Sequence, residues 1–151
     1  KTMDRQVDIG SADDAQRLVR EVVDRQSARY RSFLTQFSDG FRETELEMYK
    51  WLLLPILAAD PSELEDGVTY GQIKRKLQRH HPRGEGLNPG NITQALQSTA
   101  SLQIKKDIQP TILDYDQTQR RLTVVDRGFM IWLATQEQEE LLESAGLEGE
   151  I

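Results

Sequence analysis

The 151-residue sequence contains no cysteine. This absence excludes a disulfide framework, a thiolate metal site and a cysteine nucleophile, and it fits a reducing compartment. Long hydrophobic runs are also missing. No stretch approaches the roughly 18 apolar residues that a membrane-spanning helix needs, and the opening KTMDRQVDIG has no signal-peptide core. We therefore expect a cytoplasmic protein with no membrane partner.

The length and composition are those of one folded domain with room for a helical extension. A hydrophobic content of 37% is enough for a sizeable core. The first methionine is residue 3, which fits a fragment of a longer protein.

The charge is distributed unevenly along the chain, although the net value is −6. Residues 1–66 hold 9 Lys and Arg against 14 Asp and Glu, a net of −5. Residues 67–121 hold 9 against 4, a net of +5, and residues 122–151 hold 1 against 7, a net of −6. A basic middle segment therefore lies between two acidic flanks, so the net acidity does not exclude a nucleic-acid partner.

Two helices are predicted in the first acidic segment. Ser11 and Asp14 have the spacing of a capping box at the start of a long amphipathic helix. Thr44 with Glu47 predicts the start of a second helix, and residues 58–67 read as a polar connection rich in turn-forming residues. Apolar residues recur at three- and four-residue steps along the first helix and are expected to face inward: Ala15, Leu18, Val19, Val22, Val23, Tyr30, Phe33, Leu34 and Phe37.

The basic middle segment begins with a short extended stretch at Val68 and a helix capped by Thr69 and Gln72. Pro82 is expected to end this helix. After a loop, Asn88 is predicted to cap a second helix over residues 89–103, with Pro89 at its first position. One face of that helix is apolar, and the other carries Asn91, Gln94, Ser98, Ser101 and Lys105.

Two runs of strand-favouring residues then predict a β-hairpin over residues 111–125, followed by a helix capped by Asp126. Phe129, Ile131, Trp132 and Leu133 are expected to supply large apolar groups to the core. The order of elements is that of a winged helix-turn-helix. We predict a mainly α protein with a small β-hairpin, divided into an N-terminal long-helix extension (residues 1–43), a winged-helix domain (residues 44–135) and an acidic C-terminal helix (residues 136–151).

The run ILDYDQTQRRLTVVDRGFMIWL, together with the helices before it, resembles the winged-helix domain C-terminal to the nucleotide-binding core of bacterial P-loop ATPases of the AAA+ and STAND type. The resemblance covers about residues 12–135 and is most characteristic at Asp126, Phe129 and Trp132. It implies an accessory module whose partner is an ATPase domain of the same longer protein. The stretch GEGLNPG has no Lys-Ser/Thr pair after its glycines, so this chain lacks a Walker A motif and is not expected to hydrolyse ATP.

The polar face of the helix over residues 89–103 has two interpretations. Asn91, Gln94, Ser98 and Ser101 are the residue types that contact base edges in the major groove of double-stranded DNA. The alternative is an ordinary solvated face. This face has no acidic residue before Asp107, which favours a negatively charged partner.

Basic residues surround this face and are the candidates for phosphate contacts: Lys74, Arg75, Arg79, His80, Arg83, Lys105, Arg120 and Arg121. Arg120 and Arg121 are neighbours on a strand and point to opposite faces, so only one of them is expected to reach the partner. The alternative is a basic surface that complements the acidic helices of the chain or an acidic neighbouring domain.

Catalytic and metal sites are not expected. His80 and His81 are adjacent, so their side chains diverge, and no further ligand spacing supports a metal or another cofactor. Asp114 and Asp116 share one face of a strand, but their place beside the hairpin turn favours a role in turn formation.

The acidic C-terminal helix contains Leu141, Leu142 and Leu147, which either pack on the first helix or pair with a second copy to form a homodimer through the terminal helices.

Two functions therefore remain open. The chain is a non-catalytic DNA-binding module, or it is a protein-interaction module inside a larger ATPase.

Overall fold

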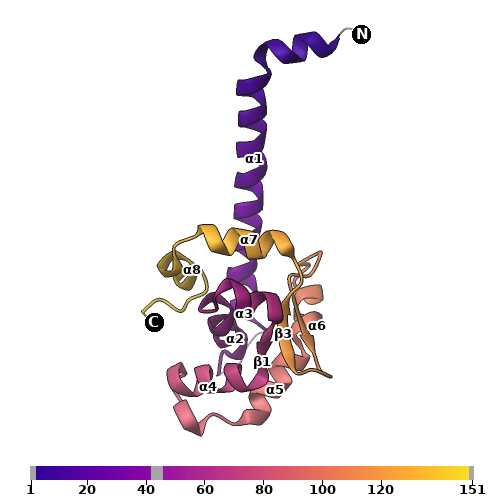
Figure 1. The fold of residues 1–151 in the computed structure, drawn as a ribbon. Helices are drawn as coiled ribbons and strands as arrows, with labels where there is room; N and C mark the ends of the chain where they lie inside the picture. Colours follow the sequence, from indigo (N-terminus) through magenta and orange to yellow (C-terminus); the bar gives the residue numbers. More distant parts are fainter. Residues whose placement is uncertain (1–2, 42–45, 150–151) are drawn as a thin grey trace.

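The computed structural model describes residues 3–41 and 46–149 of the chain (Figure 1). These residues form a mainly helical protein with a small antiparallel sheet, which confirms the predicted fold class at that level. The elements in chain order are α1 (Met3–Asp39), α2 (Met48–Leu57), α3 (Pro61–Asp66), β1 (Val68–Thr69), α4 (Tyr70–His80), the short 3-10 helix η1 (Gly84–Gly86), α5 (Pro89–Gln97), α6 (Thr99–Lys105), β2 (Leu113–Asp116), β3 (Arg121–Val124), α7 (Arg127–Thr135) and α8 (Gln138–Ser144).

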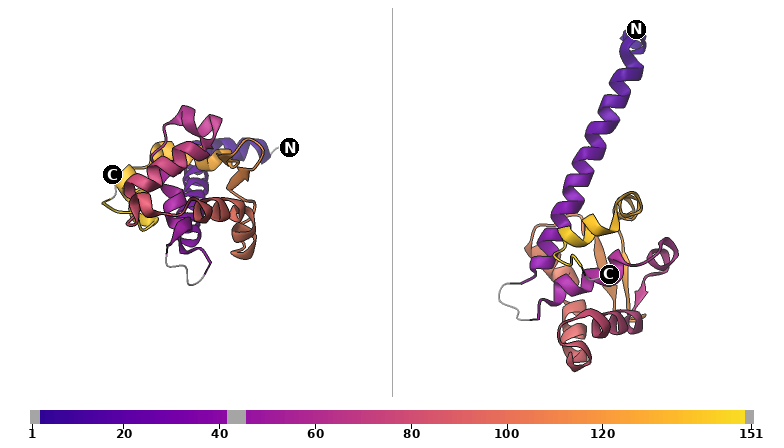
Figure 2. Two further views of the ribbon diagram at one scale, coloured as in Figure 1. Left: turned by 90° about the horizontal axis from the view of Figure 1, so that it is seen from below. Right: turned by 90° about the vertical axis from the view of Figure 1, so that its left-hand side faces the viewer.

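Helix α1 begins at Met3 instead of at Ser11, so the predicted N-terminal cap is wrong and Ser11 lies inside the helix. Only the C-terminal half of the helix is covered by the body of the protein, through Tyr30, Phe33, Leu34 and Phe37. The remainder projects as a single helix (Figures 1 and 2). The apolar residues Ala15, Leu18, Val19, Val22 and Val23, which were expected to face a core, are therefore exposed.

The next two helices differ from the sequence prediction at their starts. Thr44 lies outside the described residues, and α2 begins at Met48, after Glu47 in a left-handed conformation with no side-chain cap. The segment expected to be an irregular connection contains α3. Asp60 and Glu63 form a full capping box around Pro61, which is enough to start this short helix.

The predicted helix-turn-helix segment has the expected caps. Thr69 and Gln72 form a reciprocal capping box at the start of α4, and Asn88 accepts the N–H of Gly90 at the start of α5. The helix predicted over residues 89–103 is divided at Ser98 into α5 and α6 and ends at Lys105. Thr99 donates its hydroxyl to the carbonyl of Ala95, a back-bond that bends helices and accompanies the break.

The sheet has the strand order β1-β3-β2, and both strand pairs are antiparallel. Val68 pairs with Leu122, and Leu113 pairs with Val124. Helix α6 is joined to the start of β2 by Gln103, whose side chain is fully buried. Its Oε1 accepts the N–H groups of Ile112 and Leu113 at 2.8 and 3.1 Å, and its Nε2 donates to the carbonyls of Thr99 and Leu113 at 3.0 and 2.8 Å.

Helix α7 crosses α1 at the base of the projecting segment (Figure 1). Asp126 caps it as predicted, by accepting the N–H of Phe129 at 3.1 Å. Phe129, Trp132 and Leu133 are buried, whereas Ile131 is 65% exposed, so its predicted place in the core is wrong. Ile131 lies on the side of α7 that faces away from α1 and from the sheet.

Helix α8 folds back against α1 and α2. The hydroxyl of Thr35 donates to the carbonyl of Ser144, and Leu141, Leu142 and Leu147 are buried. Of the two interpretations of the acidic C-terminal helix, packing within the chain is therefore the one observed, and these leucines are not available to a second copy.

Candidate nucleic-acid interface

The four predicted base-facing residues come from α5 and α6, on either side of the break at Ser98. Gln94 and Ser101 are exposed, whereas Asn91 and Ser98 are half-buried. Ser101 donates its hydroxyl to the carbonyl of Ser98 at 3.0 Å. The polar row therefore does not present four equivalent side chains to solvent, because its two half-buried members turn toward α2.

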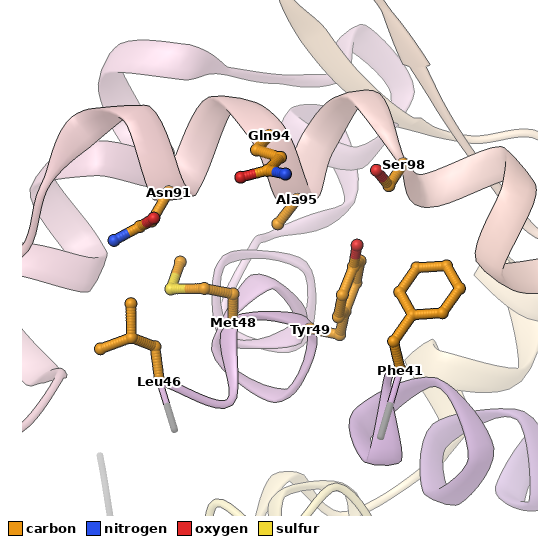
Figure 3. A pocket seen from close by; sticks show the side chains of 8 residues that line it. All are labelled: Phe41, Leu46, Met48, Tyr49, Asn91, Gln94, Ala95 and Ser98. Carbon is orange, nitrogen blue, oxygen red and sulfur yellow. The ribbon is translucent and has the colours of Figure 1, made fainter. Parts of the chain in front are cut away.

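Asn91, Gln94 and Ser98 form one wall of a groove with a volume of about 480 Å³ (Figure 3). Ala95 lies on the same helix, and the opposite side is mainly apolar and consists of Phe41, Leu46, Met48 and Tyr49. Burial raises the pKa of the Tyr49 phenol, and a hydrogen bond with Ser98 acts in the opposite direction. The groove combines amide and hydroxyl groups with aromatic and thioether surface, a composition typical of sites that recognise partly apolar ligands.

The exposed edge of α5 borders this groove at Gln94 and continues to Gln97. Gln94 and Gln97 are one turn apart and exposed, and Lys105 is exposed at the end of α6. The Lys105 ammonium lies 5.3 Å from the centre of the Phe41 ring. Gln97 was not among the predicted base-facing residues, although its place three residues after Gln94 puts the two amides on neighbouring positions of one face.

The basic residues of α4 lie on the solvent side of that helix. Arg75 and Arg79 are one turn apart and exposed, and Lys74 and His80 are half-buried. Within the described part of the chain, no carboxylate forms an ion pair with Arg75 or Arg79. These two arginines line a shallow hollow with Lys76, between Glu63 of α3 and Glu85 of η1.

The two arginines at the end of the hairpin have different surroundings, but not for the predicted reason: Arg120 lies in the turn with a positive φ of 56°, and only Arg121 belongs to β3. Arg121 donates through Nη1 to the backbone carbonyls of Asp66 and Gly67, both at 3.1 Å, so it links β3 to the turn before β1. Arg120 is exposed, with its guanidinium carbon 4.3 Å from the centre of the Tyr70 ring. Arg120 is therefore the hairpin arginine available to a partner.

Tyr70 connects the hairpin to the start of α5 and was missed by sequence reasoning. Its N–H donates to the carbonyl of Arg120 at 2.9 Å, and its hydroxyl lies 3.4 Å from the carbonyl of Pro89. The hydroxyl of Thr93 lies 3.5 Å from the same phenol oxygen. The only sequence signal was an aromatic residue directly after the cap of α4, which does not reveal a contact with a hairpin 50 residues later.

Asp116 and His81 have structural roles, whereas Arg83 is exposed. Asp116 accepts the N–H groups of Thr118 and Gln119, which confirms its predicted role in the hairpin turn. His81 is buried, and both ring nitrogens are engaged: Nδ1 accepts the N–H of Arg83, and Nε2 lies 2.9 Å from the carbonyl of Leu46. Nδ1 acts as an acceptor here, so Nε2 carries the proton and donates to that carbonyl.

Comparisons with protein-family models, with curated proteins and with solved structures gave no match to this chain. Of the helices in the described ranges, none has both the length and the apolar character needed to cross a bilayer. The surface of α4, α5 and the hairpin thus brings together exposed amides, hydroxyls and cations without a cluster of metal-ligating residues among residues 3–41 and 46–149.

Proposed function

We propose that the chain is a non-catalytic module that binds double-stranded DNA as a winged helix, with α5 in the major groove and the β2–β3 hairpin as the wing. The order of the elements and the strand order β1-β3-β2 fit that architecture. A single observation carries the functional part of the proposal. Exposed amides of α5 and exposed arginines of α4 belong to successive helices, and the hairpin arginine Arg120 stacks on Tyr70, whose hydroxyl contacts the first turn of α5.

The division of roles follows from the chemistry of these groups. Gln94 and Gln97 can each donate and accept a hydrogen bond through one amide, which matches the edge of adenine in the major groove. Arg75, Arg79 and Arg120 carry charges suited to phosphate oxygens, which set the position of the protein without reading sequence. The acidic helix α8 packs on α1 and α2, so its charges disfavour DNA on that part of the protein.

The contact between Arg120 and Tyr70 supports this assignment of the wing. Stacking on an aromatic ring holds a guanidinium in place without using its N–H donors. Because Tyr70 also approaches the first turn of α5, the wing cation is fixed relative to the helix that would read bases. A preordered cation loses less side-chain entropy when it binds a phosphate.

The experiment is a comparison of salt dependence between the natural protein and matched variants. Each phosphate contact lowers the logarithm of the affinity by about 0.9 per decade of salt on duplex DNA. Arg75→Gln with Arg79→Gln should therefore reduce this slope by nearly two contacts, with about equal loss on every sequence. Arg127→Gln, which removes an arginine near α3, should leave the slope unchanged. Equal slopes in all three proteins would refute the phosphate assignment.

Gln94→Ala tests the base-reading role separately. This change should alter the preference among duplex sequences and leave the salt slope intact, because it removes no charge. An unchanged preference would place α5 outside the major groove.

A second candidate function is protein recognition inside a larger ATPase, and the groove between α5 and α2 favours it. The apolar floor formed by Met48 and Tyr49 suits a hydrophobic side chain of a partner better than it suits a nucleic acid. DNA binding at low salt distinguishes the two functions. If the folded protein does not bind DNA at low salt, the polar wall of this groove serves a protein surface instead.

A further inference from the structure

The projecting segment of α1 carries an apolar stripe that nothing in the described structure covers. Residues 12–26 are all exposed, and this part of α1 extends beyond the body as an isolated helix (Figures 1 and 2). Leu18, Val19, Val22 and Val23 are 61%, 62%, 47% and 55% exposed. The exposure of four large aliphatic side chains to water within six residues of an isolated helix is unfavourable, which indicates an association surface.

This stripe continues the face of α1 that the body buries. Val23 and Tyr30 are seven residues apart, and Val22 and Phe33 are eleven residues apart, so each pair lies on the same side of the helix. The helix is therefore amphipathic along both halves, but the body covers only the half that begins near Ser27, where Trp132 donates its indole N–H to the serine hydroxyl. A second helix with an apolar face would cover the apolar face of the projecting half.

Charged residues beside the stripe indicate which helix that is. Asp14 and Arg25 are also eleven residues apart, so they lie along the same edge of the stripe. Both lie in the solvent-exposed part of α1, and Asp14 forms an exposed ion pair with Arg17. Two identical helices that pair antiparallel bring the same edge of each together, so Asp14 meets Arg25 of the second copy twice in the dimer.

The register required by the charges agrees with the register required by the apolar residues. In an antiparallel pair of identical helices, the two-fold axis lies at the midpoint between two residues that meet. This midpoint is position 19.5 for Asp14 with Arg25, and it is 20.5 for Leu18 with Val23 or for Val19 with Val22. With the axis set by the apolar residues, Asp14 is offset from Arg25 of the second copy by two residues, about 3 Å along the helix, which is within the reach of an arginine. A parallel pair joins opposite edges and leaves Asp14 and Arg25 without these partners.

We infer that the projecting half of α1 is a self-association arm that pairs antiparallel with the same segment of a second copy of this chain. The contact surface is small, since it is about four turns of two helices, so the dimer should be weak and concentration-dependent. A second copy of this chain was also expected from the sequence, through the terminal helices; here the contact is made by α1, and the leucines of α8 take no part because they are buried in the body.

Combined with the DNA binding proposed above, this pairing determines how a dimer presents its two DNA-binding surfaces. Helices α4 and α5 lie at the end of the body far from the arm (Figure 1). Antiparallel arms therefore direct the two α4–α5 surfaces away from each other, so a dimer would join two DNA segments and would not read adjacent half-sites of one duplex.

Sedimentation velocity of the full chain, from low to high micromolar concentration and without DNA, tests the association. The natural protein should shift from monomer toward dimer over this range. Val19→Asp with Val22→Asp should remain monomeric at every concentration, with unchanged thermal unfolding of the body, because these residues touch nothing in the body. A natural protein that stays monomeric at all concentrations would overturn the inference.

Charge exchange tests the antiparallel orientation. Asp14→Arg alone, or Arg25→Asp alone, should weaken the dimer about tenfold, because each places like charges together twice. The double variant Asp14→Arg with Arg25→Asp should restore the affinity to within about threefold of the natural protein. Asp13→Arg, on the side away from the stripe, should have little effect. If the double variant is as weak as the single variants, the antiparallel pairing is wrong. Neither result depends on DNA binding.

Discussion

The carboxylate of Asp126 lies 2.9 Å from the guanidinium of Arg29 and thereby fixes the base of the α1 arm to the first turn of α7. The same carboxylate accepts the hydroxyl of Tyr30 at 3.0 Å and the N–H of Phe129 at 3.1 Å. One side chain thus caps a helix and joins segments that are 97 residues apart.

Replacing Asp126 should destabilise the protein in a pH-dependent way. Burial raises the pKa of this carboxyl, but hydrogen bonds from Arg29, Phe129 and Tyr30 and the charge of Arg29 outweigh it, so the pKa is lowered. Its contribution is therefore complete above the ordinary value of about 3.9 and is lost as the pH falls through the lower folded value. Asp126→Asn should cost about 1–3 kcal/mol at neutral pH. Urea unfolding at several pH values measures this. A difference that persists at the lowest pH would contradict the assigned cause.

Gly128→Ala should destabilise the protein, although alanine is normally the better residue inside a helix. A Cβ at this position would lie 2.4 Å from the Tyr30 hydroxyl and 3.2 Å from Asp126 Oδ1. The substitution therefore displaces the Tyr30–Asp126 hydrogen bond, and the expected loss is about 1–3 kcal/mol. The matched control is Gly128→Ala in a Tyr30→Phe background, where the phenol oxygen is absent and the loss should be smaller. Chemical denaturation of the four proteins provides the comparison, and an equal loss in both backgrounds would contradict the clash with the hydroxyl.

Gln103→Glu should be strongly destabilising despite its nearly unchanged volume. The amide nitrogen donates to the carbonyls of Thr99 and Leu113, and a carboxylate oxygen there would face two acceptors in a buried site. We expect a loss of about 2–4 kcal/mol, from an unpaired buried charge or from protonation of the carboxyl. Thermal unfolding at neutral pH tests this, with exposed Gln97→Glu as the control. Equal stability of the two variants would exclude the buried network as a main contributor.

Arg120 and Arg121 should separate stability from binding. Arg121→Ala removes the bonds to the carbonyls of Asp66 and Gly67 and should lower stability by about 1 kcal/mol without changing the salt slope for DNA. Arg120→Ala should reduce the slope by about one contact and leave stability nearly unchanged. Reversed effects of the two substitutions would mean that the wing arginine has been assigned incorrectly.

Local signals predicted the parts of the fold that depend on a few neighbouring residues. The caps at Thr69, Asn88 and Asp126 were visible because a cap requires a short polar side chain at a fixed spacing from the helix start. The capping box of Asp60 and Glu63 was equally local, but it was read as part of a loop because turn-forming residues surround it.

The remaining features depend on contacts between distant segments. The amphipathic pattern of α1 predicted that one face would be covered, but it could not show that the body ends near Ser27. In the same way, nothing in the sequence near Gln103 indicates that its amide would bind β2. The polar row of α5 was read correctly as polar. Its division between a groove and solvent depends on the position of Tyr49, which belongs to another helix.

DNA binding by the α4–α5 surface can be measured by fluorescence anisotropy of the full chain with a labelled random duplex at two salt concentrations. We expect binding at low salt that weakens steeply as salt increases, with a slope of several phosphate contacts. No binding at low salt, by protein whose thermal unfolding shows that it is folded, would refute DNA binding and leave protein recognition as the function of this surface.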